Sequence, residues 1–342
     1  MKIIDAHTHI NKRNIESGFA SLFAMAKQLN YDRLSVLSLQ CGGDLLQNLT
    51  CALCKYLRPE MIYAFGGLDY ITGRDFVSQA ENLRAMGYDG IKMLEGKPTT
   101  RKLLKRALDE PAYDDFFSYL EECKFPVLLH IADPGTFWDR ERAPDWAVER
   151  GWLYDETHVP YAQYYDEVDR MLAKHPNLRA IFAHFYFLSD NPVRAQRFLD
   201  EHPNVSIDVT AGIEMYEDFA KDPAFWREFF IKNENRIIFG TDSNDEPSQG
   251  GDKVELNSYG AMEIDFLRYD KDITVYDKQL HGLGLPNETL EKIFSLNYLK
   301  YVGEPQLLDI AAIIKEADYI RSFLKNDSDK EKLELLVSKL KK

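Results

Sequence analysis

Short runs of apolar and β-branched residues recur along the chain, and a stretch with helical periodicity follows most of them. Turn-forming residues bound the runs, and this alternation is typical of βα units that build a parallel sheet. Eight runs are predicted to be strands, at residues 2–7, 34–39, 62–66, 90–94, 126–131, 178–184, 205–209 and 236–241. Eight parallel units in one chain predict an α/β fold, a closed (β/α)8 barrel of the TIM type.

The helical stretches extend beyond the eighth unit. Between the strands they cover residues 19–29, 44–57, 74–86, 113–123, 161–174, 192–201, 223–233 and 254–267. One more helix is predicted at residues 288–301 and two at residues 305–340. We therefore predict a barrel over residues 1–303 and a C-terminal helical tail over residues 304–342. Because the tail is too small to bury a core by itself, we expect it to pack on the barrel or on a partner subunit.

Composition and charge exclude several classes of protein. The formal net charge of -14 disfavours a nucleic-acid binder and an anionic membrane surface. The apolar runs are strand-sized, far short of the roughly 20 residues of a transmembrane helix. Met1 leads almost directly into a strand, and the four cysteines lack the spacing of a disulfide scaffold. We expect a cytoplasmic protein that acts on a small molecule and forms a homo-oligomer, most simply a dimer.

Metal-compatible side chains stand at the ends of four predicted strands. In Ile-Asp-Ala-His-Thr-His, His7 and His9 point the same way, about 6.6 Å apart along the strand, so one cation can lie between them. Strand five ends at His130, strand six at His184, and Asp242 follows strand eight. Barrel active sites form at the C-terminal ends of strands, so these residues are expected to converge. Burial of such groups is costly unless they are paired or bind metal, and the set therefore predicts a metal site.

With these residues in place, the sequence resembles the amidohydrolase superfamily, particularly the branch that contains aminocarboxymuconate-semialdehyde decarboxylase and the amidohydrolase-2 proteins. The matching segments span about residues 1–300 and are Ile-Asp-Ala-His7-Thr-His9, Gly90-Ile-Lys92, the strand-closing His130 and His184, Phe-Gly-Thr-Asp242 and Ile-Phe-Ser-Leu-Asn297. The resemblance implies one zinc-like ion with His7, His9, His130 and Asp242 as ligands. It also implies that His184 is an acid/base group beside the metal-bound water. The tail lies outside the resemblance.

Lys92 has more than one possible role. In binuclear members of the superfamily a lysine on strand four is carboxylated and bridges two metals, whereas one metal is commoner in this branch. An uncarboxylated Lys92 could instead bind a substrate carboxylate or pair with Asp242, since the pKa of a lysine shifts readily. We favour a substrate or network partner over a bridging ligand for a second ion.

The segment after strand five, residues 132–160, is unusually long for a βα loop and predicts a lid. Three of the four tryptophans of the chain fall in it, namely Trp138, Trp146 and Trp152. They predict an aromatic wall over a pocket, with local packing of the loop as an equal alternative. The predicted substrate contacts are Lys92, Asp133, Trp138 and Tyr186.

These residues together predict an enzyme that activates water. A bound dication lowers the pKa of its water to about 7, and Asp242 or His184 can take the proton. We therefore predict hydrolysis of a C–O or C–N bond in a lactone, ester or amide of a small, carboxylated substrate. Proton delivery to carbon and loss of carbon dioxide from an aromatic or enol-type acid is the alternative. A non-catalytic barrel that binds metal or ligand is a second alternative.

Overall fold

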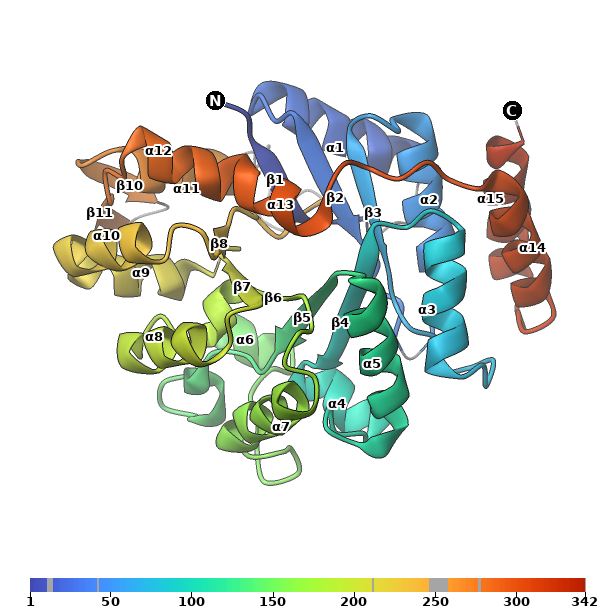
Figure 1. Ribbon diagram of the computed structural model, residues 1–342, viewed down its shortest axis with the longest axis horizontal. Helices are drawn as coiled ribbons and strands as arrows, with labels where there is room; N and C mark the ends of the chain where they lie inside the picture. The colour runs from blue at the N-terminus through green and yellow to red at the C-terminus, as the bar shows by residue number, and fades with distance from the viewer. Residues whose placement is uncertain (11–14, 42, 211, 246–257, 276–277, 342) are drawn as a thin grey trace.

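The strands form one parallel sheet in the computed structural model, which describes residues 1–10, 15–41, 43–210, 212–245, 258–275 and 278–341 (Figure 1). They are β1 (Ile4–His9), β2 (Arg33–Leu37), β3 (Ile62–Gly66), β4 (Gly90–Gly96), β5 (Val127–Ile131), β6 (Ala180–Phe182), β7 (Val205–Asp208), β8 (Ile237–Ile238) and β9 (Ser243–Asn244). Their order in the sheet follows the chain from β8 back to β1, and β9 lies on the other side of β1. The elements predicted from the apolar runs are therefore the strands of the fold.

The sheet closes on itself because the eighth unit returns to the first strand. The backbone N–H of Ala6 donates to Phe239 O at 3.0 Å, and β9 pairs with β1 in parallel. The predicted strand at residues 236–241 is shorter in the structure, where β8 covers only Ile237–Ile238. Asp242, with a φ of 54°, turns the chain before β9. The predicted TIM barrel is confirmed.

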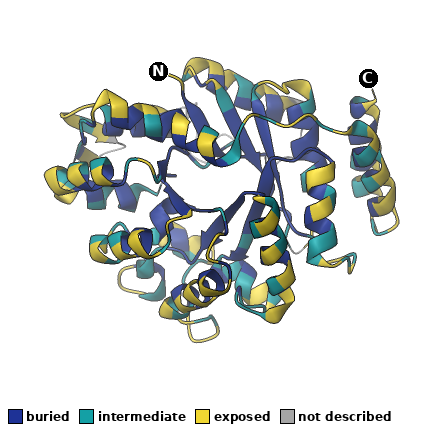
Figure 2. Ribbon diagram, in the orientation of Figure 1, coloured by how far each residue is buried: buried dark blue, intermediate teal, exposed yellow. Residues whose placement is uncertain are grey.

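Helices surround the barrel, with their exposed faces outward and the strands buried (Figure 2). The α-helices of this layer are α1 (Ile15–Gln28), α2 (Gln47–Leu57), α3 (Phe76–Ala85), α4 (Pro98–Leu104), α5 (Asp114–Cys123), α6 (Asp145–Glu149), α7 (Tyr161–Lys174), α8 (Pro192–Glu201), α9 (Ile213–Lys221), α10 (Pro223–Lys232), α11 (Ser258–Arg268), α12 (Asn287–Glu291) and α13 (Asn297–Val302). Short 3-10 turns occur at Pro111–Tyr113, Gly135–Trp138 and His184–Phe187, and a π-helical turn lies at Lys292–Leu296. The sequence did not predict α4, α6 and α9, whose shortness leaves little periodicity to detect.

Two further features differ from the sequence prediction. A hairpin of β10 (Asp272–Val275) and β11 (Lys278–His281) follows α11, in a region predicted to lack strands. Strand β6 ends at Phe182, and His184 begins a 3-10 turn and does not end the strand. The predicted helix at residues 254–267 is present as α11 from Ser258, and its residues 254–257 lie outside the described part of the chain.

The interior of the barrel is packed with apolar side chains at the end away from the predicted site. Ile4, Leu37, Phe65 and Leu128 belong to one buried cluster that Tyr298 of α13 joins. The hydroxyl groups of Tyr298 and Ser35 are hydrogen-bonded to each other inside the barrel. The polar side chains at the C-terminal ends of the strands therefore stand on a filled, rigid base.

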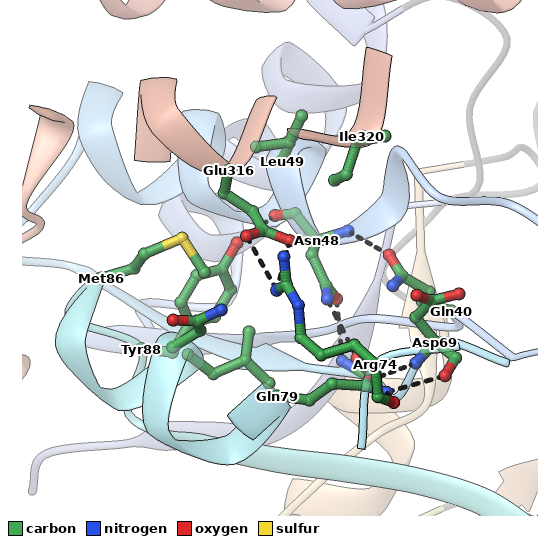
Figure 3. Close-up of a pocket in the computed structure, with 13 residues that line it drawn as sticks. Gln40, Asn48, Leu49, Asp69, Arg74, Gln79, Met86, Tyr88, Glu316 and Ile320 are labelled. Carbon is green, nitrogen blue, oxygen red and sulfur yellow. Dashed lines mark hydrogen bonds and ion pairs between the residues drawn. The ribbon is translucent and has the colours of Figure 1, made fainter. Parts of the chain in front are cut away.

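The C-terminal tail is a hairpin of α14 (Ile310–Arg321) and α15 (Asp327–Leu340) that packs beside α2 and α3 (Figure 1). Figure 3 shows Arg74 of the barrel between Asp69 and Glu316, and its Nη1 donates to both Glu316 oxygens at 2.9 Å. The cavity at this junction has a volume of about 30 Å³, which suits a few waters and not a substrate. The division into a barrel (1–303) and a tail (304–342) stays a prediction.

All four cysteines are free thiols, and Cys51 and Cys54 are buried. In the described part of the chain, none of the helices combines the length and the apolar character that a membrane crossing requires.

Candidate metal centre

His7 and His9 lie on β1 with both rings buried at the mouth of the barrel, 5.1 Å apart between ring centroids. His9 Nδ1 is 2.9 Å from the carbonyl oxygen of Leu37. A carbonyl oxygen only accepts, so Nδ1 of His9 carries a proton and donates it to this contact. His7 Nδ1 is 2.9 Å from Asp208 Oδ2, so Nε2 is the nitrogen that faces the site. Both histidines thus present Nε2 to the site.

Asp242 completes a three-residue cluster with these histidines. Its Oδ1 is 3.1 Å from His9 Nε2 and 3.8 Å from His7 Nε2. The ligand atoms of His7, His9 and Asp242 all lie within 4.8 Å of one another. Asp242 follows His7 by 235 positions in the sequence (242 minus 7). Residues of β1 and of the β8–β9 turn nevertheless meet at one point.

Asp5 of β1 links this strand to the connection between β8 and β9. Thr241 donates to Asp5 from its backbone N at 3.1 Å and from Oγ1 at 2.7 Å, and His7 N donates at 3.1 Å. Burial raises the pKa of Asp5 to about 7 despite these hydrogen bonds. One carboxyl group thus holds the backbone at His7 and at Thr241, next to Asp242.

The cluster fits a divalent cation on chemical grounds. His9 Nε2 and Asp242 Oδ1 lie 3.1 Å apart, so one cation between them could bind both atoms. Burial and then Lys92 hold the pKa of His7 well below its usual value, so the imidazole is neutral, as a metal ligand must be. Burial raises the pKa of Asp242, but its hydrogen bond with His9, together with the other histidine interactions, outweighs burial, and the pKa lies well below its usual value. Two imidazoles and a carboxylate suit zinc and related divalent metals.

His130 and His184 lie beside this cluster without belonging to it. The His184 ring is 5.4 Å from the His7 ring and 4.8 Å from the His130 ring, measured between centroids. His130 Nε2 is 3.1 Å from Asp133 Oδ1. Burial lowers the pKa of both histidines to about 4. The structure therefore brings all five predicted chemical groups to the barrel mouth, and coordination by His130 stays a prediction.

Backbone strain collects at this end of the barrel. His184, Phe185, Tyr186 and Phe187 have φ values of 58°, 54°, 55° and 48°, a left-handed turn that costs about 1–2 kcal/mol per residue. Asp208 Oδ1 anchors the turn by accepting from His184 N at 2.8 Å. Ala132 after β5 and Asp242 after β8 also have positive φ. Such strain is concentrated at functional sites, and here it marks the ends of three strands.

Lys92 reaches the same site from β4. It is buried, and its Nζ is 3.2 Å from His7 Nε2. Burial lowers its pKa to about 8, although Asp208 and Asp242 oppose the shift. A lysine in this position is near enough to interact with a ligand of the metal cluster, and its role stays a prediction.

The other predicted substrate contacts make contacts within the protein. Asp133 is buried and bonded to His130, Lys97 and Tyr154. Trp138 donates from Nε1 to Val159 O at 3.2 Å within the segment 132–160 that is predicted to be a lid. The Tyr186 ring packs against Phe182 and Phe198 in the core, at 4.7 and 4.5 Å between centroids. Substrate contact by these three side chains stays a prediction.

Asp208 is the functional residue that the sequence analysis missed. It ends β7, is fully buried, and holds both His7 and the backbone of His184. Its signal in the sequence is a single carboxylate in the apolar run Val-Ser-Ile-Asp-Val. A carboxylate that binds the second nitrogen of a metal-ligating histidine is a common arrangement in metal sites.

Comparisons with known proteins agree with this geometry. The profile of a family described as Amidohydrolase, the amidohydrolase-2 family, matches residues 41–300. No curated protein sequence matches the chain. Among solved structures, a probable 2-pyrone-4,6-dicarboxylic acid hydrolase from Acinetobacter baumannii with bound citric acid is 14% identical, with a TM-score of 0.58 over 89% of this chain and 100% of that chain.

Two decarboxylases have a similar fold. The 2,6-dihydroxybenzoate decarboxylase from Rhizobium is 14% identical, with a TM-score of 0.56 over 88% of this chain and 98% of its own. A 5-carboxyvanillate decarboxylase from Novosphingobium aromaticivorans with bound manganese is 15% identical, with a TM-score of 0.54 over 88% and 97%. At these identities the structures show a shared fold, whereas the family profile covers more than half of the chain. The resemblance predicted from the sequence is confirmed: the chain belongs to the amidohydrolase-2 family and is an enzyme of its metal-dependent hydrolase and decarboxylase class.

Proposed function

We propose that the protein is a metal-dependent hydrolase that cleaves a C–O or C–N bond of a small, carboxylated substrate. The observation that carries this proposal is the convergence of His7, His9 and Asp242 within 4.8 Å. A divalent ion bound there would supply a water molecule of lowered pKa and polarise a carbonyl group. His7, His9 and Asp242 would hold the ion, with His130 as a fourth ligand.

The remaining groups of the site have complementary roles in this proposal. His184 is the acid/base group, because its buried, neutral ring lies beside the rings of His7 and His130. Asp242 can also receive a proton from the attacking water. Lys92 is a cationic partner for a substrate carboxylate, close to the metal ligands. In this proposal His184 and Asp242 transfer protons, and Lys92 pairs with a negative charge on the substrate.

Zinc is the proposed metal, bound as one ion, since the ligand set of two or three imidazoles and one carboxylate suits it. A second ion bridged by a carboxylated Lys92 is the less favoured arrangement. Manganese bound to the 5-carboxyvanillate decarboxylase makes manganese the first other metal to test. We further propose that the enzyme acts in the cytoplasm as a homo-oligomer, most simply a dimer.

Decarboxylation is the second candidate function. Two of the structurally similar proteins are named as decarboxylases of aromatic acids, and one is named as a hydrolase. The same residues would serve, with His184 or Asp242 delivering a proton to carbon as carbon dioxide leaves. The substrate would then be an aromatic or enol-type acid whose carboxylate is lost and not merely bound.

Metal analysis with product detection tests both candidates. The purified enzyme loaded with zinc or manganese is incubated with panels of lactones, amides and aryl carboxylates. A newly formed carboxylic acid supports hydrolysis, and released carbon dioxide supports decarboxylation. His9→Ala should lose bound metal and turnover together, while Asp218→Asn on α9 should keep both. Wild-type protein that binds neither metal would overturn the proposal.

A further inference from the structure

Asp133 connects the predicted metal ligand His130 with the lid formed by residues 132–160. Its Oδ1 is 3.1 Å from His130 Nε2. Lys97 Nζ lies 2.9 and 3.0 Å from its two oxygens, and the hydroxyl of Tyr154 donates to Oδ2. Because Asp133 is buried, these three side chains take the place of water as its hydrogen-bond partners. One carboxylate is therefore shared between a barrel histidine, a residue of the β4–α4 connection and the far end of the lid.

This contact determines which nitrogen of His130 is free. An ionised carboxylate only accepts, so His130 Nε2 must donate to it and Nδ1 keeps the lone pair. His7 and His9 have the opposite arrangement, since their Nδ1 atoms are bound by Asp208 and by Leu37 O. Asp133 thus prevents the His130 ring from turning over and selects Nδ1 as the atom it can offer to a metal.

The lid supports two of the three partners of Asp133, Tyr154 and Lys97. Tyr154 belongs to a small apolar core of the lid with Phe137 and Ala147, and the Trp138 ring lies 4.6 Å from its ring. Trp152 of the same core lies under Lys97, whose Nζ is 4.2 Å from the ring centroid. Tyr154 and Lys97 therefore both pack against aromatic side chains of the lid.

We propose that Asp133 is a positioning residue that couples the lid to the metal centre through His130. With the lid in place, Tyr154 and Lys97 fix Asp133, and Asp133 fixes His130 for coordination. By linkage, a metal held by His130 stabilises the closed lid by the same factor by which the lid contacts tighten metal binding. This inference rests on the proposed function in one respect, because it requires His130 to bind the ion.

Two variants and a matched control test the coupling. Tyr154→Phe removes one hydrogen bond to Asp133 and keeps the ring, while Asp133→Asn disrupts the whole contact. Tyr164→Phe is the control, because the Tyr164 ring lies 6.0 Å from Trp138 and its buried hydroxyl has no hydrogen-bond partner among the described residues. The dissociation constants of Zn²⁺ and Mn²⁺ alone are measured by competition with a chelator. We expect about 10-fold weaker binding for Tyr154→Phe, a larger loss for Asp133→Asn and no change for Tyr164→Phe.

A second measurement follows the lid without any substrate. Trypsin cleaves after Arg140, Arg142 and Arg150, which all lie in the lid. Added metal should slow cleavage of the wild type and of Tyr164→Phe, and should protect Asp133→Asn much less. A ¹⁵N spectrum of the histidine side chains should show His130 protonated on Nε2 in the wild type.

The outcomes separate the two proposals. If the wild type binds neither metal, the proposed function fails. If it binds metal and both Tyr154→Phe and Asp133→Asn bind as tightly, the coupling is wrong and the proposed function stands. An equal loss in Tyr164→Phe and Tyr154→Phe also overturns the coupling, because it would reflect general packing of the lid.

Discussion

Asp208 and His7 form a buried pair in which Asp208 Oδ2 lies 2.9 Å from His7 Nδ1. The other oxygen of the same carboxylate accepts from the backbone N of His184 at 2.8 Å. One side chain from β7 therefore orients a metal ligand on β1 and anchors the strained turn that carries the acid/base histidine.

Replacement of Asp208 by Asn should weaken metal binding by about 10- to 100-fold. If the amide oxygen keeps its bond to His184 N, the amide NH₂ faces His7 Nδ1. That nitrogen must then accept, and the proton moves to Nε2, the atom that faces Asp242. Chelator competition with Zn²⁺ measures the loss.

The control for this variant is Asp218→Asn, which changes a carboxylate on α9 that pairs with Ser189 and Lys221. Its metal affinity should match that of the wild type. Undiminished affinity in Asp208→Asn would show that the carboxylate does not select the His7 tautomer.

The barrel could be predicted because most strands are apolar runs followed by turn residues, a pattern that depends only on local sequence. The meeting of His7, His9 and Asp242 could be predicted because parallel strands of a barrel end at one face. The contact between Asp208 and His7 could not be predicted in this way, because one carboxylate inside an apolar strand does not reveal its partner 201 residues away.

Backbone geometry explains the other differences. Phe185, Tyr186 and Phe187 all have positive φ, which large aromatic residues rarely adopt, so nothing in the sequence predicts the left-handed turn. That turn decides where the Tyr186 ring points. The Tyr154–Asp133 hydrogen bond joins positions 21 residues apart in the segment after β5, and no periodic pattern links two such positions.

The buried pair of Lys55 and Asp89 should be important for stability and not for the metal. Lys55 Nζ is 2.5 Å from Asp89 Oδ2, and neither side chain is exposed. Asp89 Oδ1 also accepts from Gln306 N at 2.8 Å, which ties the tail to the barrel. Lys55→Met leaves the carboxyl group buried without its cation and should lower the free energy of unfolding by about 3–5 kcal/mol.

Urea denaturation measures this effect, with the double variant Lys55→Met/Asp89→Asn as the comparison. The double variant should recover part of the lost stability, because it removes the unpaired charge. A single variant as stable as the wild type would mean that Asp89 is already neutral in the folded protein.

The β10–β11 hairpin should lose stability as the pH rises. His281 Nδ1 is 2.7 Å from Asp272 Oδ1 and its Nε2 is 2.8 Å from Asp270 Oδ1. The hydrogen bonds that His281 donates to Asp272 and Asp270 raise its pKa above the usual value of 6.5. Because the folded pKa exceeds the unfolded one, this contribution is complete below about pH 6.5 and is lost as the pH passes the raised value.

Proton NMR titration of His281 and amide exchange of Ile273 and Leu280, which pair across the hairpin, test this prediction. In Asp270→Asn/Asp272→Asn the pKa should fall back toward 6.5 and the pH dependence of exchange should flatten. An unchanged pKa in that variant would contradict the proposed cause.

Gly240 should be irreplaceable for the metal centre, because a Cβ atom at this position would lie 2.9 Å from His7 Cβ and 2.8 Å from Thr210 Oγ1. Thr210 Oγ1 is itself 3.1 Å from His7 Nδ1, so both neighbours would have to move. We expect Gly240→Ala to displace the His7 ring and weaken metal binding at least about 10-fold, since metal ligands tolerate only small changes in distance. Gly43→Ala is the control, because Gly43 is exposed and a Cβ there meets nothing within 4 Å. Metal titration of the two variants side by side decides the matter: equal affinities would mean that β1 can shift to accept the methyl group without moving His7 Nε2 away from Asp242.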